Sequence, residues 1–95
     1  MKLFVDDLRP YPEGYECCRT YDDAVLLLSI LKSIETVNLD FDLGTPKTGL
    51  DLLIYMKEND IHPKEIIVHS SHPEGVKMME KYIKEHFKDS KYYRT

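Results

Sequence analysis

Two short apolar runs that each end in a pair of aspartates constrain the fold of this chain more than any other feature. The runs cover residues 2–5 and 36–39, and the acids that follow them are Asp6, Asp7, Asp40 and Asp42. Runs of this length and composition are typical of buried parallel strands. If the two strands are neighbours, four carboxylates meet at one edge of a sheet. Because carboxylates this close repel one another, they favour a shared cation or a bound proton.

The predicted cation is magnesium, with manganese as the substitute. Carboxylate oxygens are the ligands that hard divalent cations prefer, so we expect Asp6, Asp7, Asp40 and Asp42 to supply the ligands. Which member of each pair binds the metal stays open. Cys17 and Cys18 are adjacent and have no spacing typical of a zinc site. They are interpreted as structural thiols in a reducing cytoplasm.

Strands and helices alternate along the chain. Strands are expected at residues 2–6, 15–19, 36–42 and 65–70. Three helix starts resemble capping boxes, in which a hydroxyl residue is followed three positions later by an acid; the pairs are Thr20 with Asp23, Thr48 with Asp51, and Ser71 with Glu74. Apolar residues at helical spacing follow each start. The alternation predicts one α/β domain, residues 1–95, with a small doubly wound parallel sheet of the flavodoxin or receiver type.

The connection between the first two expected strands cannot be a regular helix. Residues 7–14 contain Pro10, Pro12 and Gly14, which interrupt helical hydrogen bonding. We therefore expect an extended loop that forms one wall of the acidic site. At the other end of the chain, residues 90–95 show no clear fifth strand. A short edge strand there is the alternative.

The fourth expected strand ends in a second set of polar residues, His69, Ser70, Ser71 and His72. In open α/β sheets ligands bind at the carboxyl ends of the strands, so these residues and the aspartates are expected at one rim. Ser70 and Ser71 are phosphate-binding candidates at a helix N-terminus, and Arg9 is a third. His69 or His72 is the candidate general acid or base. The alternatives are a packed His69, a capping Ser71 and an Arg9 that only neutralises Asp7.

Three sequence motifs resemble a known family. They are Asp6-Asp7-Leu8-Arg9-Pro10, Leu39-Asp40-Phe41-Asp42-Leu43-Gly44 and His69-Ser70-Ser71-His72-Pro73. Together they resemble the cyclic-phosphate-processing receiver domain, a divergent relative of response-regulator receivers. The resemblance implies a receiver-like fold and a cyclic phosphate as the substrate. The chain departs from signalling receivers because it lacks the first helix and a clear fifth strand ending in lysine; Lys91 does not match that lysine.

Three functions therefore stay open. The first is magnesium-dependent hydrolysis of a cyclic phosphate or related phosphoester, with Asp40, His69 and His72 as catalytic residues. The second is a signalling receiver phosphorylated on Asp40, and the third is a catalytically silent partner-binding module. The expected ligand is a small phosphorylated or cyclic-phosphate molecule.

Charge and hydropathy bear on membrane contact, nucleic-acid binding and the cellular location of the protein. No apolar run approaches the ~18 residues of a membrane span, and no signal peptide is apparent, so a cytoplasmic location without membrane contact is expected. Residues 76–95 are weakly basic, but their lysines recur at helical spacing beside acids. This pattern favours a solvated helix face over a nucleic-acid surface. The oligomeric state is left open.

Overall fold

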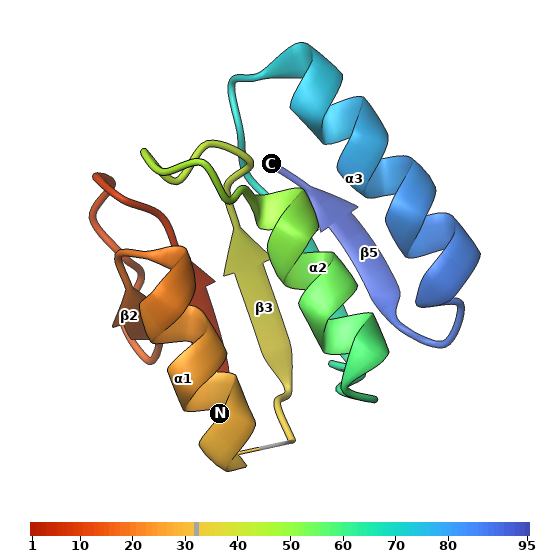
Figure 1. The fold of residues 1–95 in the computed structure, drawn as a ribbon, viewed down its shortest axis with the longest axis horizontal. Coiled ribbons are helices and arrows are strands. Elements are labelled where there is room, and N and C mark those ends of the chain that lie inside the picture. Colours follow the sequence, from red (N-terminus) through yellow and green to blue (C-terminus); the bar gives the residue numbers. More distant parts are fainter. Residues whose placement is uncertain (32) are drawn as a thin grey trace.

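The computed structural model describes residues 1–31 and 33–95, which form a five-stranded sheet and three helices (Figure 1). The strands are β1 (Lys2–Val5), β2 (Glu16–Cys18), β3 (Thr36–Leu39), β4 (Glu65–Val68) and β5 (Lys91–Arg94), and the helices are α1 (Tyr21–Leu31), α2 (Gly49–Glu58) and α3 (Pro73–His86). None of the described helices has the length and apolar character needed to cross a membrane.

The sheet is parallel with the strand order β2-β1-β3-β4-β5, so the predicted receiver-like α/β fold is confirmed. The expectation of four main strands is wrong, because residues 91–94 pair with β4 as a fifth strand. This strand exposes most of its side chains at the edge of the sheet, and it therefore lacks the continuous apolar signal of the inner strands.

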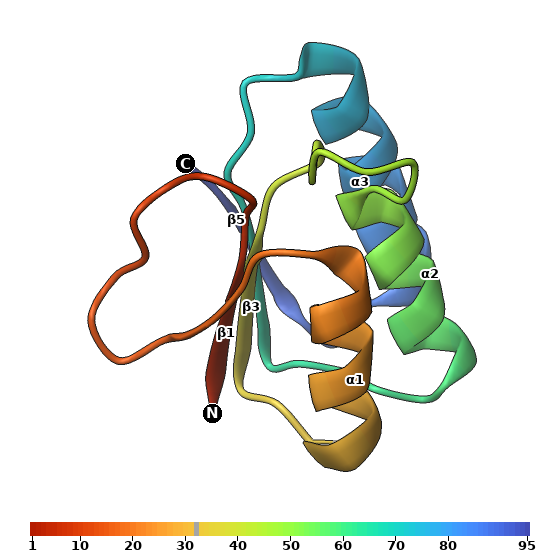
Figure 2. The same ribbon diagram turned by 60° about the vertical axis from the view of Figure 1, so that its left-hand side comes forward.

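All three helices lie on one face of the sheet (Figure 2). The connections that contain α1, α2 and α3 each step in the same direction across the strand order, and right-handed crossovers that step the same way lie on the same face. The connection from β1 to β2 steps backwards and so lies on the opposite face. It forms a loop, as predicted. The expected doubly wound arrangement is therefore wrong, since the second face of the described chain carries this loop and no helix.

The core lies between the sheet and the helices. Its strand residues alternate along β1, β3 and β4, namely Leu3, Val5, Val37, Leu39, Ile66 and Val68, and they pack against Leu28, Leu53, Met56, Met79 and Ile83 of the helices. Full burial of such a side chain contributes roughly 1.5–3 kcal/mol. A one-residue slip of any strand would exchange its two faces, so this alternation sets the register. Val5 pairs with Leu39 and Leu39 with Val68, so the residues that follow them emerge at the same level.

One of the three predicted capping boxes is complete, and it joins Thr48 and Asp51. At Thr20 half of the expected box is present, since its side chain accepts a hydrogen bond from the Asp23 N–H at 3.1 Å. The third is wrong. His72 caps α3, and its Nδ1 accepts a hydrogen bond from the Gly75 N–H at 2.9 Å. The reason is Pro73, which favours the first helical position and therefore moves the cap to the residue before it.

Phe41 fixes the segment that carries Asp40. A Cβ atom at Gly75 would lie 2.2 Å from the Phe41 ring, and a Cβ at Gly49 would lie 2.1 Å from the Asp40 carbonyl oxygen. Only glycine permits these approaches, so the starts of α2 and α3 both press on residues 40 and 41.

We expect Gly75→Ala to lower the free energy of unfolding by about 1–3 kcal/mol, because the new methyl group overlaps the Phe41 ring. Urea unfolding measures the change. Phe41→Leu in the same chain should recover part of the loss, since the smaller side chain leaves room for the methyl group. Strictly additive losses in the double variant would show that the two sites do not interact.

Candidate functional site

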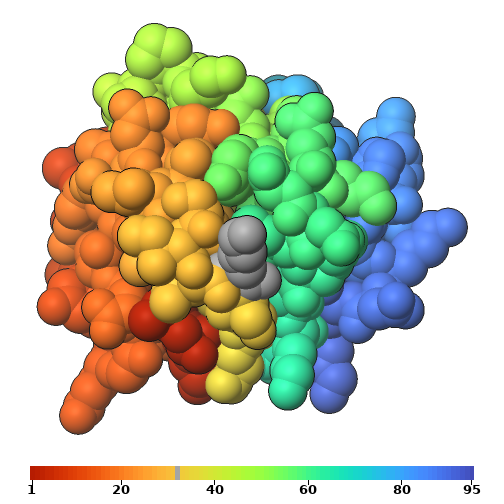
Figure 3. Space-filling model, turned by 60° about the horizontal axis from the view of Figure 1, so that its bottom comes forward, coloured from red at the N-terminus to blue at the C-terminus, as the bar shows by residue number. Residues whose placement is uncertain are grey.

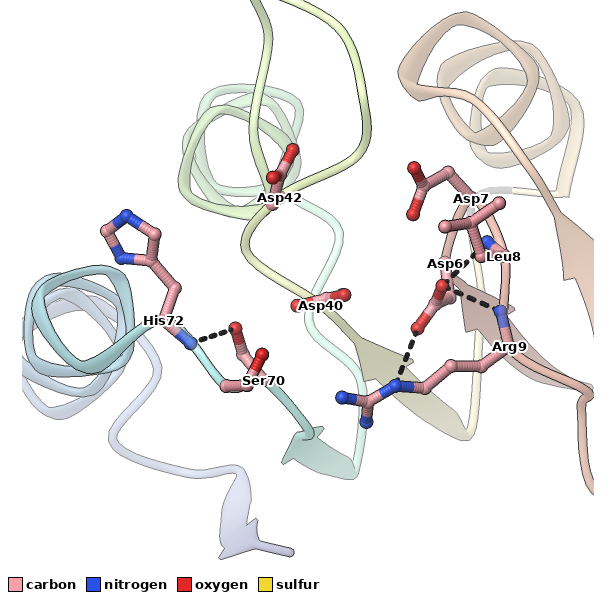
Figure 4. Close-up of a pocket in the computed structure, with 9 residues that line it drawn as sticks. Asp6, Asp7, Leu8, Arg9, Asp40, Asp42, Ser70 and His72 are labelled. Atoms are coloured by element: carbon pink, nitrogen blue, oxygen red, sulfur yellow. Dashed lines mark hydrogen bonds and ion pairs between the residues drawn. The ribbon is translucent and has the colours of Figure 1, made fainter.

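A polar pocket opens where β1, β3 and β4 end (Figure 4). Its volume is about 320 Å³, and its lining residues are Asp6, Asp7, Leu8, Arg9, Asp40, Asp42, Ser70, Ser71 and His72. Eight of these nine are residues that the sequence singled out. Leu8 is the residue that sequence reasoning missed. His69 lies beneath the pocket and does not line it.

Asp6 is the most constrained carboxylate of the pocket, with only 1% of its surface exposed. Its Oδ1 accepts hydrogen bonds from the N–H groups of Leu8 at 2.9 Å and Arg9 at 3.0 Å. Its Oδ2 faces Nε2 of His69 at 2.8 Å and Nε of Arg9 at 3.8 Å. Burial alone would raise the pKa of Asp6, but these hydrogen bonds outweigh burial and hold the pKa below its usual value. The carboxylate is therefore charged and held in one orientation.

His69 extends a line of polar contacts away from the pocket. Its Nε2 contacts Asp6 and its Nδ1 contacts Oδ1 of Asn38. The ring stacks on Phe4 with centroids 4.6 Å apart and an interplanar angle of 5°. Because both ring nitrogens have partners and the residue is 5% exposed, His69 is held rigidly on the loop-covered face of the sheet.

Asp6, Asp40 and His69 form the one cluster among the described residues that can hold a metal ion, with one ligand atom from each residue within 4.8 Å of the others. Asp40 is half-buried; its Oδ1 accepts a hydrogen bond from the Phe41 N–H at 2.7 Å, which leaves its second oxygen for a ligand. Neighbouring ligands of a six-coordinate ion with bonds of about 2.1 Å lie roughly 3 Å apart. The 2.8 Å between Asp6 and His69 is compatible with this spacing. Two carboxylates and one imidazole therefore fit a small divalent cation.

Asp7 and Asp42 line the pocket but lie outside this cluster of three. A strand of residues 36–42, as expected from the sequence, would point Asp40 and Asp42 in the same direction. This expectation is wrong, because β3 ends at Leu39 and neither residue lies in the strand. Asp42 is exposed, and its Oδ1 accepts a hydrogen bond from the Gly44 N–H at 2.9 Å. Asp7 lies against Gly44, where φ is +70° and a Cβ would come within 2.8 Å of Asp7 Oδ2.

Arg9 is the candidate phosphate ligand from the loop, and its half-exposed side chain extends across the pocket beside Asp6 (Figure 4). Arg19 holds the turn that carries it, because one guanidinium nitrogen donates to the carbonyl oxygens of Asp6 at 3.2 Å and of Arg9 at 2.6 Å. The Arg9 backbone is therefore fixed at both its N–H and its carbonyl group, and only the side chain is free to adjust to a ligand.

The β4–α3 connection forms the opposite wall. Ser70 is buried, and its Oγ accepts a hydrogen bond from the His72 N–H at 3.1 Å, whereas Ser71 is exposed. The His72 ring packs on Phe41 with centroids 4.8 Å apart and is turned away from Asp40 (Figure 4). The Gly75 bond to Nδ1 leaves Nε2 as the nitrogen that carries the proton of the neutral ring.

The lowered pKa of Asp6 predicts a pH dependence of stability. The charged form stabilises the fold above the unfolded-state pKa of about 3.8, and this contribution is lost as pH falls through the lower folded-state pKa. With a chelator present, the unfolding free energy of wild type should fall between about pH 5 and about pH 2, and Asp6→Asn should fall less steeply. Asp89→Asn, at an exposed position, is the control and should follow wild type. Parallel curves for all three proteins would contradict the role of Asp6.

Comparison with known proteins agrees with this geometry. Residues 1–85 match the family described as the cyclic-phosphate processing receiver domain, and this range includes every residue of the pocket. No protein with a curated description matches the chain. Because the match covers most of the 95 residues, the chain belongs to the cyclic-phosphate-processing receiver domain family.

Proposed function

We propose that this domain hydrolyses a cyclic phosphate, or a related phosphoester, with the help of one divalent cation. The observation that carries the proposal is the cluster of Asp6, Asp40 and His69 at the base of a pocket with Arg9 on its wall. Family membership supports a cyclic phosphate as the substrate class. The pocket adds the charge needed for metal and phosphate chemistry.

Asp6 and Asp40 would hold the cation through oxygen, and His69 through Nε2. When bound, the cation supplies charge that neutralises the phosphoryl group in the transition state. His69 Nε2 cannot both donate a proton to Asp6 and bind a metal, so cation binding displaces that proton. An imidazole ligand suits manganese better than magnesium, which favours oxygen and gives up its water reluctantly. Of the two predicted ions, manganese therefore suits this site better.

The remaining polar residues would bind and orient the phosphoryl group. Arg9 offers paired N–H donors that match two phosphoryl oxygens. Ser70 accepts one hydrogen bond through Oγ and still has its own hydroxyl proton to donate. Both groups lie on opposite walls of the pocket, so a phosphate between them is held from two sides.

His72 is the better candidate for the proton that the leaving oxygen needs. Hydrolysis adds water to phosphorus and breaks one P–O ester bond, and the departing oxygen takes up a proton. His72 lines the pocket, and none of the described residues accepts a hydrogen bond from its Nε2–H, whereas both nitrogens of His69 are engaged beneath the pocket. The His72 ring is turned away from Asp40, so the proposed role requires it to swing toward the bound phosphoryl group. We therefore assign the proton to His72 and the role of a metal ligand beside Asp6 and Asp40 to His69.

The alternative, a signalling receiver phosphorylated on Asp40, needs a lysine beside that aspartate, and Lys91 does not lie there. Lys91 starts β5 and pairs in register with Glu65, which is four strand positions before the level of Asp40. Figure 3 shows that end of the molecule, where the N-terminal residues (red) lie beside those that begin β3 (yellow). Met1 contacts Glu35 there through a 2.9 Å hydrogen bond. Lys91 is thus at the opposite end of the sheet from the pocket.

Metal titration separates the two possible sets of ligands. Calorimetry should show one manganese ion bound by wild type, tighter than magnesium, and binding should be lost in Asp40→Asn. His69→Gln should weaken manganese more than magnesium, because only the nitrogen ligand distinguishes the two ions. Little effect of Asp42→Asn would support the cluster of three residues, and a loss as large as that of Asp40→Asn would favour four carboxylates. Binding by Asp40→Asn equal to that of wild type would refute the site.

Turnover of a panel of cyclic phosphodiesters with manganese or magnesium tests the reaction. We expect His72→Ala to lower the rate by about 10²–10⁴-fold, the usual cost of losing a general acid. His62→Ala, which alters a histidine packed on Phe87 away from the pocket, is the control. Full activity of His72→Ala would exclude its role. Stable phosphorylation of Asp40 by acetyl phosphate, without turnover, would favour the receiver function.

A further inference from the structure

Leu8 is an apolar side chain at the rim of an otherwise polar pocket. It is 82% exposed, more than any other large hydrophobic residue among those described, and it lines the pocket between Asp7 and Arg9. Single exposed leucines are common on protein surfaces and need no explanation. Leu26 on α1, which is 63% exposed, is such a residue. The exposure of Leu8 is informative only together with its position and its rigid backbone.

The backbone on both sides of Leu8 is fixed by four hydrogen bonds. Asp6 Oδ1 accepts from the N–H groups of Leu8 and Arg9, and Arg19 donates to the carbonyl groups of Asp6 and Arg9. The Asp6 side chain is buried, so this anchor does not move with the surface. Leu8 is therefore held out over the pocket by the same turn that orients Arg9. Because the backbone is already fixed, a ligand that covers Leu8 has to order only the side chain.

The size of the pocket also exceeds the needs of a phosphate group. Pockets that bind small organic ligands have volumes of about 300–1,000 Å³, and the volume here is about 320 Å³. The charged groups, Arg9 and the cluster of Asp6, Asp40 and His69, account for a phosphoryl group and a cation. Leu8 is the apolar surface that remains for the rest of a ligand.

We propose, resting on the proposed function, that Leu8 contacts the organic part of the substrate and selects phosphoesters with an apolar group next to the phosphate. Covering Leu8 removes its apolar surface from water, and this gain is absent for inorganic phosphate or for a small polar ester. Leu8 is then a specificity-determining residue, while Arg9 binds the phosphoryl group of every ligand alike.

Phenyl phosphate and methyl phosphate are the probes that test this proposal. Both are phosphomonoesters, the class of product that opening a cyclic phosphate yields, and they differ in their apolar group. In calorimetry with manganese present, wild type should bind phenyl phosphate about fivefold or more tightly than methyl phosphate. Leu8→Ser should lose this preference and keep the affinity for methyl phosphate. Leu26→Ser, the matched exposed leucine on α1, should behave as wild type.

The possible failures have different signatures. Equal affinity of wild type for the two probes, or an equal loss for both in Leu8→Ser, would overturn the role of Leu8 while leaving the phosphate site in place. Binding of neither probe to wild type would overturn the phosphate site itself, and the role of Leu8 with it. Thermal unfolding is the control for folding. Both leucine variants should unfold at the same temperature as wild type, since both side chains are exposed. A change in affinity then comes from the lost contact with the ligand.

Discussion

The buried charge of Asp6 is the interaction on which the site depends. A carboxylate shielded from water is costly unless its oxygens are hydrogen-bonded, and here each oxygen has partners. The partners come from the β1–β2 loop and from the end of β4, so one carboxylate joins three parts of the chain. The loop wall, the His69 ring and the Arg9 side chain all take their positions from it. This constraint makes the pocket a property of the folded domain, since no single motif holds these parts together.

The handedness of the crossovers explains why the two faces of the sheet differ beside the site. Because α1, α2 and α3 all lie on one face, the other face is free to hold the stack of Phe4 and His69 and the contact with Asn38. A helix between β1 and β2 would occupy this space, and the proline-rich loop does not. The short connection therefore accounts for both the buried histidine and the rim that carries Leu8.

The two histidines of the β4–α3 connection acquire different roles from their surroundings. They are three residues apart, and the sequence alone predicts either one as the proton donor. His69 points back along the strand into a buried network, while His72 caps a helix at the rim. Capping commits Nδ1 and so determines which nitrogen of the neutral ring can face a ligand. The same backbone geometry thus places one ring in the buried cluster with Asp6 and Asp40, and the other at the edge of the pocket.

Local sequence determined the alternation of strands and helices, the loop after β1 and the rim at which the polar residues gather. These features depend on short apolar runs, on Thr48 with Asp51, and on Pro10, Pro12 and Gly14, all of which act within a few residues. Tertiary structure decided which acids join His69, because Asp6 and His69 are 63 positions apart and meet through strand order and register. It also decided the pairing of β5, whose exposed edge position gives it no apolar pattern of its own. Contacts over such separations depend on the packing of the whole core, and that packing is the physical reason why they cannot be read from a local pattern.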